Sequence, residues 1–513
     1  MKKLVKKWKL TSLLLFLILI FGLVLRLYNL TILPVFADEA IYIRWSQIMS
    51  AEPTLRFLPL SDGKQPLFMW ILMFVVKRIS DPLFAGRILS VLSGLGTMIG
   101  LFLLTFYLFK SKKAALVSTL AWAISPFSLF FDRMALVDSL LTMFSVWTIF
   151  LGIISTETLR FDMAILAGFS LGFAYLTKSP ALFFAMLLPV MWIFVKNKNQ
   201  IIKTILLSLT TFLISQAMYN ILRLGPNFQM VALRNQDYVF PISHFWTNPK
   251  DPLISHIGQI RDWINRLGPG TLLILAPAGF ILNFKKHKKV VIFLAVWFLF
   301  PILVQSEFAK VFTARYILFT IAPLIILAAS FFNRDFKNNF IKLLTMVCVY
   351  FVLESLVIDW KILASPQIVP FPESERSGYL EEWTAGTGIK EVADYIRTQV
   401  ADLPAGRQVI IGTEGFFGTL PDGLQMYVEK VPRVVVKGVG VTISDVHPSL
   451  IDSKKAGNKT YLVVNSTRFK GDPLKLGLNL IAQYPKAVRI DGSRESLLFF
   501  EVTDKSITSL EKI

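Results

Sequence analysis

Apolar runs of about twenty residues, the length that a helix needs to cross a lipid bilayer, alternate with short polar links along the first two thirds of the chain. The first run extends from Leu10 to about Tyr28 and follows a basic N-terminus; no small-residue cleavage site follows it, so we expect a retained helix. Further spans are predicted at 84–109, 114–131, 138–156, 162–177, 180–196, 203–222, 270–284, 289–305, 314–332 and 340–358. The pattern predicts a polytopic α-helical membrane protein with about eleven transmembrane helices.

The links between these spans differ in charge. Those on the side of the N-terminus are basic, which is the positive-inside pattern of cytoplasmic loops. Their residues are Lys110, Lys112, Lys113, Arg160, Lys196, Lys198, Lys285, Lys286, Lys288, Lys289, Arg334 and Lys337. The apolar stretch 66–76 is too short to span, and counting it would reverse the parity, so we expect an interfacial or re-entrant helix there. We therefore expect a multi-pass protein of the plasma membrane, with its N-terminus in the cytoplasm and its C-terminal region outside.

From about Trp360 the pattern changes to the shorter alternation of a water-exposed domain. Strands are predicted at 408–414, 433–439, 459–467 and 497–502, and helices at 388–400 and 472–484. We expect residues 1–359 to form the membrane domain and residues 360–513 to form a small extracytoplasmic α/β domain.

Composition narrows the class of protein further. Of the 513 residues, 54% are hydrophobic and only 17% are charged, which excludes a soluble globular, disordered or coiled-coil protein. The net charge is +20, but residues from Trp360 onward carry 19 Lys and Arg against 18 Asp and Glu. The excess of basic charge therefore belongs to the membrane part and indicates topology, not nucleic-acid binding. The only cysteine, Cys348, lies in an apolar run and excludes a disulfide framework.

Two charged sites lie on the predicted outer side near the start of the chain. Asp38 and Glu39 follow Pro34, where Asp38 can cap a short helix whose apolar stripe, within 41–49, would lie in the membrane interface. A helix cap without catalytic function is the simple alternative. Lys64 precedes the short apolar stretch, where a lysine often only reaches towards the headgroups.

Three more charged sites follow on the same side. Asp132 and Arg133 lie in a loop and Asp138 enters the next helix, where an ionisable group is costly unless it is used or paired. A structural Arg133–Asp138 pair is the alternative to function. Lys178 lies in a very short loop at the membrane edge, where it could hold a lipid phosphate or only reach the headgroups. Arg315, at the mouth of a helix, suits bidentate binding of phosphate.

Other motifs carry less chemistry. His244 and His256 are twelve residues apart, which is no known metal-ligand spacing. The segment 412–418 and the pair Gly386 and Gly388 are too loose for a nucleotide-binding fingerprint and indicate turns.

Together the charged sites suggest one reaction. Carboxylates can take a proton from an acceptor or hold a divalent cation, and cations can stabilise a departing phosphate. A group transfer from a lipid phosphate needs this combination. The leading alternative is a transporter or flippase for a polar or lipid-linked substrate, in which the charged groups would line a path. Against it, the acidic groups lie at one mouth of the bundle and no internal repeat is visible.

At these motifs the chain resembles the protein O-mannosyltransferase and aminoarabinose transferase group of GT-C glycosyltransferases, in particular bacterial members of the family 39 type. The segments that carry the resemblance occur in the family's order and cover most of the chain. They are DEAIY (38–42), GKQPLFMW (63–70), DRMALVD (132–138), LTKSP (176–180) and RYILFTIAPL (315–324), with 386–397 and 413–428 similar to the outer domain of bacterial members.

The resemblance implies a GT-C fold and an inverting glycosyltransferase, a hexosyl- or pentosyltransferase. Its donor would be a polyprenyl- or dolichyl-phosphate-linked sugar between the helices, and its acceptor an extracytoplasmic glycan, lipid or protein. Asp38, in the pair with Glu39, would be the general base or would position the acceptor, and Asp138 matches the second acidic position. A divalent ion held by Asp38 and Asp138 stays open, and no organic cofactor or nucleic-acid partner is expected.

The resemblance also assigns the donor phosphate. Lys178 would hold it and Arg315 matches a basic position of the family, while Lys64 and Arg133 are further candidates. The motif here is Lys178-Ser-Pro where many members have Lys-Gly-Pro, and Lys64-Gln-Pro-Leu where Lys-Pro-Pro-Leu is common. Neither change removes a charge. A catalytically dead member that acts as a scaffold through its outer domain is a third possibility.

Overall fold

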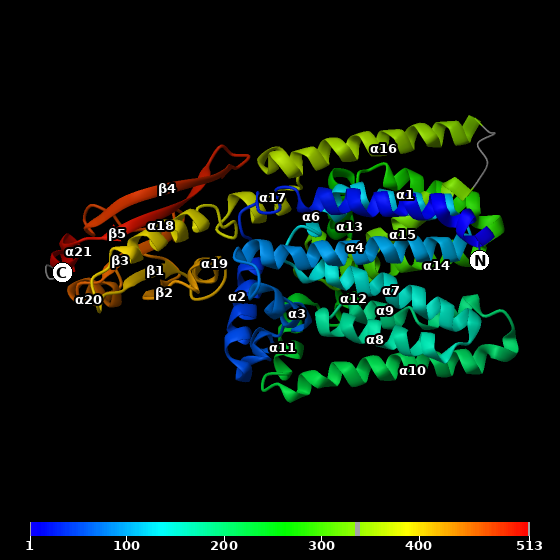
Figure 1. Cartoon of the computed structure of the whole chain (residues 1–513), viewed down its shortest axis with the longest axis horizontal. Coiled ribbons are helices and arrows are strands. Elements are labelled where there is room, and N and C mark those ends of the chain that lie inside the picture. Colours follow the sequence, from blue (N-terminus) through cyan, green and yellow to red (C-terminus); the bar gives the residue numbers. More distant parts are fainter. Residues whose placement is uncertain (1, 334–338, 511–513) are drawn as a thin grey trace. The chain divides into compact units, whose positions relative to one another are not determined.

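The structure is a computed structural model that describes residues 2–333 and 339–510 (Figure 1). The chain folds into two compact units, and neither unit is continuous in sequence. The first consists of Met1–Leu30, Glu52–Ile71 and Arg87–Pro372, and the second of Thr31–Ala51, Leu72–Gly86 and Glu373–Ile513. The link that holds Arg334 and Lys337 lies outside the described residues.

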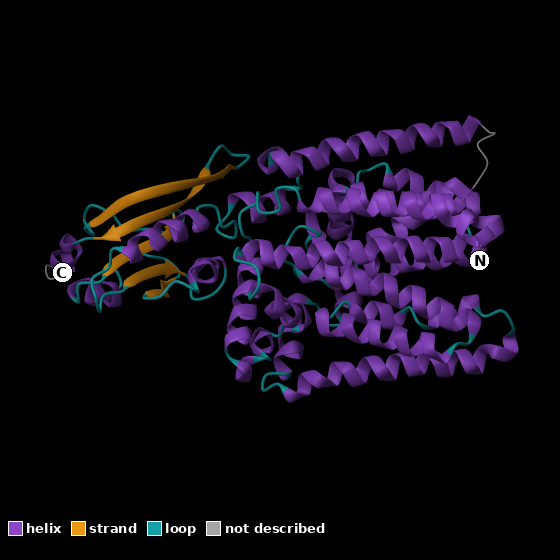
Figure 2. Ribbon diagram, in the orientation of Figure 1, coloured by secondary structure: helices purple, strands orange, loops and turns teal. Residues whose placement is uncertain are grey.

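The first unit is helical, and its helices follow the predicted apolar runs (Figure 2). Their bounds are α1 (Lys2–Leu27), α4 (Pro82–Phe109), α5 (Lys112–Ile124), α6 (Pro126–Phe131), α7 (Val137–Thr158), α8 (Phe161–Thr177), α9 (Ala181–Met186), α10 (Ile201–Tyr219), α11 (Gln229–Tyr238), α12 (His244–Thr247), α13 (Leu253–Leu267), α14 (Leu272–Phe308), α15 (Leu318–Ala329) and α16 (Asn339–Ala364). The short apolar helix predicted at 66–76 is α3 (Leu67–Val76).

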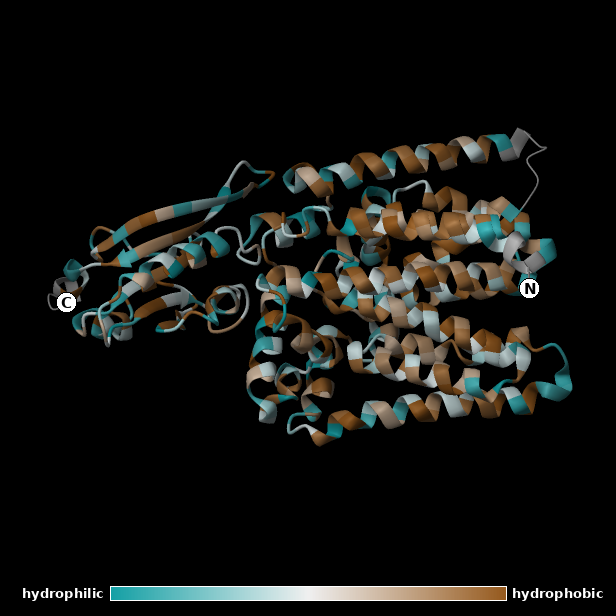
Figure 3. Cartoon of the chain, in the orientation of Figure 1, coloured by the Kyte–Doolittle hydropathy of each residue, from teal (hydrophilic) through white to brown (hydrophobic). Residues whose placement is uncertain are grey.

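Hydrophobic residues predominate along these helices (Figure 3), and several helices expose apolar side chains, which is unfavourable in water. Leu206 and Leu213 of α10 are each 57% exposed, and Leu353 of α16 is 58% exposed. Among the described residues, seven helices are long and apolar enough to cross a membrane, and three shorter apolar helices accompany them. The chain is therefore a multi-pass membrane protein, as the sequence predicts.

The long element α14 contains a turn that the sequence predicts as a link between two spans. His287 has non-helical angles (φ −127°, ψ 39°), so two helices meet there. Its ring lies 5.2 Å from that of Phe109, and its Nε2 is 3.2 Å from Asn333, which follows α15. After the turn the chain returns to α13, where His256 Nδ1 donates to the Ser306 carbonyl at 3.0 Å. The two halves of α14 therefore form a hairpin.

Two predicted spans are interrupted by proline. The span predicted at 114–131 is α5 followed by α6, with an extended residue, Ser125, between them (ψ 121°). Pro126 starts the second helix because its ring excludes a helical conformation for the residue before it. The span predicted at 180–196 is α9 followed by a 3₁₀ helix that begins at Pro189.

The second unit is built around a mixed sheet with order β2-β1-β3-β5-β4. The strands are β1 (Val409–Glu414), β2 (Val434–Gly440), β3 (Lys459–Asn465), β4 (Leu478–Val488) and β5 (Arg494–Val502). β1 is parallel to β2 and β3, while β5 is antiparallel to β3 and β4. The helices are α2 (Ala37–Ala51), α17 (Glu373–Arg376), α18 (Ile389–Ala401), α19 (Thr419–Val428), α20 (Pro448–Lys455) and α21 (Asp504–Leu510).

The four predicted strands and the helix predicted at 388–400 are confirmed. The helix predicted at 472–484 is wrong, because this segment contains a turn and the start of β4. Gly477 has φ +65°, which interrupts a helix, and Leu478 then pairs with Val502 of β5. The apolar spacing in 474–481 imitates a helix, but pairing with β5 decides the structure.

Candidate active site

Lys178 and Asp138 form an ion pair within the first unit. Lys178 ends α8 in an extended conformation, and Asp138 lies in the first turn of α7. Lys178 Nζ is 2.6 Å from Asp138 Oδ1, and the side chains are 21% and 3% exposed. Asp138 Oδ2 has no hydrogen-bond partner among the described residues. Because α7 and α8 pack side by side, they join two charges that are forty residues apart in sequence.

An aromatic ring covers the same ammonium group. Lys178 Nζ lies 4.0 Å from the centre of the Tyr316 ring, and the Arg315 guanidinium carbon lies 5.6 Å from that ring. Both residues belong to a 3₁₀ turn, Ala314–Ile317, directly before α15. The structure thus brings Asp138, Lys178 and the Arg315–Tyr316 turn together. Lysine and arginine side chains of this kind are suited to binding a phosphate.

The second part of the GKQP motif is close to the LTKSP motif. Gln65 Nε2 donates to Ser179 Oγ at 2.8 Å, so both residues that depart from the usual family motif contact each other. Lys64 Nζ lies 3.4 Å from Asp62 Oδ2, and Asp62 Oδ1 also pairs with Arg234 at 3.7 Å. The charge of Lys64 is therefore partly balanced by its own turn.

The contacts of Arg133 differ from the two that the sequence suggested, which were a donor phosphate and Asp138. Its side chain is buried, and its two terminal nitrogens donate to the carbonyls of Leu25, Arg26, Tyr28 and Asn29 at 2.6–3.1 Å. Asp132, next to it, pairs with the equally buried Arg26 at 2.9 Å. These contacts fix the end of α1 against the loop before α7.

Asp38 and Glu39 lie in the second unit, in the first turn of α2. Glu39 is fully buried, and its Oε2 accepts a hydrogen bond from the Phe36 backbone N–H at 3.0 Å. Glu39 therefore makes the capping contact that the sequence analysis assigns to Asp38. Asp38 is half-buried at the same end of the helix.

Residues 373–510 of the second unit, which we call the outer domain after the location predicted for them, hold this helix through several contacts. The Ala37 N–H donates to the Thr384 carbonyl at 3.1 Å, and Gln47 Nε2 donates to the Met426 carbonyl at 2.9 Å. Arg44 pairs with Glu429 at 3.4 Å, and burial raises the pKa of that carboxyl group. The apolar stripe predicted for α2 is thus packed largely against α19.

The metal site left open above has little support in the arrangement of ligands. No group of three or more His, Cys, Asp and Glu side chains with suitable spacing occurs within the described residues. Asp138 already holds a lysine ammonium group at 2.6 Å. An ammonium group at this distance competes with a divalent cation for the Asp138 carboxylate.

Sequence reasoning misses several polar residues of the membrane unit. Tyr316 directly follows Arg315, and only its aromatic ring signals a cation site. Arg26 lies at the end of an apolar run, and a charge at that position could have been recognised from the sequence as a residue that needs a partner. Glu307 is 4% exposed, and neither carboxylate oxygen has a hydrogen-bond partner in the chain as described, 2–333 and 339–510.

Part of the chain is similar in sequence to a known protein family. Residues 63–219 match the family model described as dolichyl-phosphate-mannose-protein mannosyltransferase. This segment contains Lys64, Asp138 and Lys178. The match agrees, over this segment, with the resemblance to membrane glycosyltransferases seen in the sequence. No curated protein sequence matches the chain significantly.

Solved structures support the fold of the whole chain. ArnT from Cupriavidus metallidurans bound to undecaprenyl phosphate is 15% identical, with a TM-score of 0.60 over 97% of this chain and 98% of that chain. The same protein in the apo state is 14% identical, with a TM-score of 0.57 over 96% of this chain and 98% of that chain. At this identity the likeness concerns the fold, which is ArnT-like.

Proposed function

We propose that the chain transfers a sugar from a polyprenyl-phosphate donor to an acceptor outside the cytoplasm, with inversion at the anomeric carbon. The observation that carries the proposal is the Lys178 ammonium group, set between Asp138 at 2.6 Å and the Tyr316 ring at 4.0 Å. It lies inside the segment that matches the family model. The ArnT structure bound to undecaprenyl phosphate supports a polyprenyl carrier.

The acceptor hydroxyl oxygen would attack the anomeric carbon from the face opposite the phosphate. The bond from that carbon to the phosphate oxygen breaks, and its electron pair leaves on the phosphate. Asp38 would receive the hydroxyl proton. Lys178 and Arg315 would neutralise the charge that develops on the phosphate, where electrostatic stabilisation has its largest effect.

The remaining candidates support these groups. Asp138 would orient Lys178 before the donor binds. The lysine ammonium group would then share its interactions between Asp138 and the donor phosphate. Lys64, balanced by Asp62, would add a more distant positive charge. Glu39 would fix the start of α2 and so hold Asp38 in place. The backbone contacts of Arg133 favour a structural role at the end of α1 over phosphate binding.

The topology is also part of the proposal. Counting each half of α14, the interrupted helices and α8 as passes gives the eleven that the sequence predicts. An odd number of passes would put the N-terminus and the outer domain on opposite sides of the membrane, and the basic links would assign the N-terminus to the cytoplasm. The basic links at 110–113 and 285–289 would then both face the cytoplasm.

The test uses the full chain in nanodiscs with a panel of polyprenyl-phosphate sugars and an extract of envelope glycans and proteins as acceptor source. Mass spectrometry follows free polyprenyl phosphate and bound lipid. We expect release by the wild type and a loss of about 10²–10⁴-fold in Asp38→Asn, the range for a general base, with donor still bound.

The matched control is Asp162→Asn, at a residue whose side chain is 56% exposed and pairs with Arg160. It should behave like the wild type. Equal release by Asp38→Asn would contradict the role of the base. Failure of the wild type to bind any donor lipid would contradict the whole proposal and favour the transporter or the scaffold.

A further inference from the structure

The sheet of the outer domain has a strand order that reverses direction beside β1, and it belongs to the same unit as the helix that carries Asp38. β1 is the central parallel strand: the chain leaves it through α19 to β2 on one side, and then crosses through α20 to β3 on the other. In open α/β sheets the point where the strand order reverses is where ligands bind, outside the carboxyl ends of the strands. Here that point lies after Glu414 of β1 and Asn465 of β3.

Aromatic side chains are exposed at this point. The loop after β1 is Gly-Phe-Phe-Gly, in which Phe416 is 70% and Phe417 45% exposed. Trp383 is 36% exposed, and its ring lies 3.9 Å from where a side chain on Gly418 would begin. We name these three residues the aromatic surface. Exposed apolar side chains that lie together often mark a binding site.

The loop that presents the phenylalanines is held firmly. The Gly415 N–H donates to the Gly440 carbonyl of β2 at 2.7 Å, and the Gly418 N–H donates to Asp422 Oδ2 at 2.7 Å. A side chain on Gly438 would come within 2.1 Å of the Gly415 carbonyl oxygen. The absence of a side chain at Gly438 therefore allows the loop to pack closely against β2, while Phe416 stays exposed.

Polar groups border the aromatic surface. The Arg468 guanidinium lies 4.2 Å from the centre of the Trp383 ring and 3.7 Å from Glu414 Oε1. Glu414 accepts two hydrogen bonds of 2.6 Å from the backbone and side-chain nitrogens of Asn465. Asn465 is 1% exposed, and its Oδ1 has no hydrogen-bond partner in the described part of the chain.

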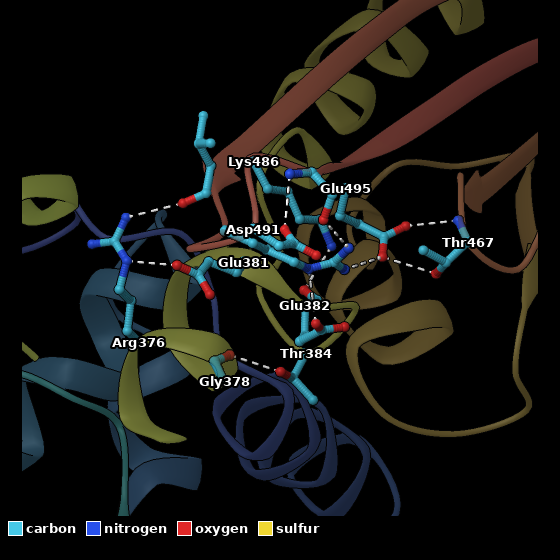
Figure 4. A network of polar contacts seen from close by, with 12 residues as sticks. Arg376, Gly378, Glu381, Glu382, Thr384, Thr467, Lys486, Asp491 and Glu495 are labelled. Atoms are coloured by element: carbon cyan, nitrogen blue, oxygen red, sulfur yellow. Dashed lines mark hydrogen bonds and ion pairs between the residues drawn. The ribbon is translucent and has the colours of Figure 1, made fainter. Parts of the chain in front are cut away.

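A network of ion pairs fixes the loops around this surface (Figure 4). Glu495 accepts from the Thr467 N–H and hydroxyl group at 2.8 Å each and pairs with Arg489 at 3.1 Å. Arg489 also pairs with Glu382 at 3.0 Å, and Lys486 donates to the Glu382 carbonyl at 2.9 Å. The loop after β3 and the segment with Trp383 are thus attached to the same two strands.

The same segment holds the helix of the proposed base. Thr384, next to Trp383, accepts the backbone hydrogen bond from Ala37, which directly precedes Asp38. On the other side of the surface, the Phe417 ring lies 5.7 Å from that of Trp45 in α2, with an angle of 31° between the planes. The aromatic surface is therefore continuous with α2.

We propose that the aromatic surface is a carbohydrate-binding subsite, which holds sugar rings of a glycan acceptor whose reacting end meets Asp38. The inference rests on the proposed function. The C–H faces of pyranose rings pack on aromatic rings, while a guanidinium group beside them, here that of Arg468, donates to hydroxyl groups. A lipid-inserting loop would need apolar surroundings, whereas here the charged Arg468 lies against the Trp383 ring.

Binding is measured on the full chain in nanodiscs by saturation-transfer difference NMR and titration calorimetry. The probes are mannohexaose, chitohexaose and maltohexaose, with a Ser/Thr-rich peptide as the competing class. We expect at least one oligosaccharide to bind, and Phe416→Ala/Phe417→Ala to weaken it by about tenfold through the loss of two stacking contacts. The conservative variant Phe417→Tyr should retain binding.

The matched control is Ile490→Ala, an outer-domain residue that is 78% exposed and lies in the link between β4 and β5. It should bind like the wild type. Binding of the peptide alone, of no probe, or of oligosaccharide equally by the double variant would overturn the inference. Asp38→Asn separates the two proposals, because it should lose turnover and keep oligosaccharide binding. If it keeps turnover while the aromatic surface still binds sugar, only the proposed function fails.

Discussion

At the scale of single residues, the proposed donor site depends on the balance between one lysine and one aspartate. Lys178 and Asp138 are close enough for a strong charge-assisted bond, and Asp138 is 3% exposed. A buried pair contributes little net stability, but removal of one partner leaves an uncompensated charge. The pair therefore links stability to donor binding, and substitutions can separate the two effects.

Lys178→Met should weaken donor binding by about tenfold or more and destabilise the chain by about 3 kcal/mol, since it leaves Asp138 charged and buried. Adding Asp138→Asn should restore most of the stability without restoring donor binding. Thermal unfolding in nanodiscs and calorimetry with a polyprenyl-phosphate sugar measure the two quantities. Full recovery of donor binding in the double variant would contradict the role of Lys178.

A second residue-scale effect concerns Lys486 in the outer domain. Burial lowers the pKa of its ammonium group to about 8 from the ordinary 10.5, although the carboxylates of Glu495 and Glu414 oppose this. Between pH 8 and 10.5 the unfolded chain thus binds more protons at this residue than the folded chain. The contribution of Lys486 to the free energy of unfolding should rise with pH across this range.

Thermal unfolding of the full chain at pH 8, 9 and 10 tests this. Relative to Lys486→Met, the wild type should gain stability as the pH increases. A difference between the two proteins that stays constant with pH would show that the ammonium group has an ordinary pKa.

At the scale of elements, close approach of helices depends on small residues. A side chain on Gly279 of α14 would begin 1.9 Å from the Leu327 carbonyl oxygen of α15, whereas one on Gly258 of α13 would meet nothing within 4 Å. Gly279→Ala should force the two helices apart and lower the unfolding temperature clearly. Gly258→Ala should be neutral or stabilise by about 0.5–1 kcal/mol, through helix propensity alone. Equal effects of the two changes would contradict this packing.

The elements also show how far the sequence could predict this structure. The apolar runs predicted most helices, and the alternation of apolar and polar residues predicted four strands. Both follow from the sequence because the spacing of buried side chains is set by the order of apolar and polar residues. They failed at 472–484, where Leu478 pairs with β5 instead of continuing a helix. Asp138 and Lys178 were both identified as candidates, but Arg133 was considered as the partner of Asp138. Only the packing of α7 on α8 brings Lys178 there.

At the scale of the whole molecule, the hairpin of α14 decides on which side the outer domain lies. Two passes joined at His287 would give an odd total, and we then expect the outer domain outside the cytoplasm. A single pass through 272–308 would change the parity and place that domain with the basic links. The contacts of His287 with Phe109 and Asn333, and of Ser306 with His256, support the hairpin.

Single cysteines introduced into a Cys348→Ser background test the topology in intact cells. Ser493→Cys, in the outer domain, should react with a membrane-impermeant maleimide. Lys113→Cys and Lys286→Cys should react only after permeabilisation, because both are predicted to face the cytoplasm with the N-terminus. Labelling of Lys286→Cys in intact cells would place the turn of α14 outside and contradict the hairpin. If Ser493→Cys is protected in intact cells, the outer domain, and with it Asp38, does not lie on the side of the membrane where we expect the acceptor.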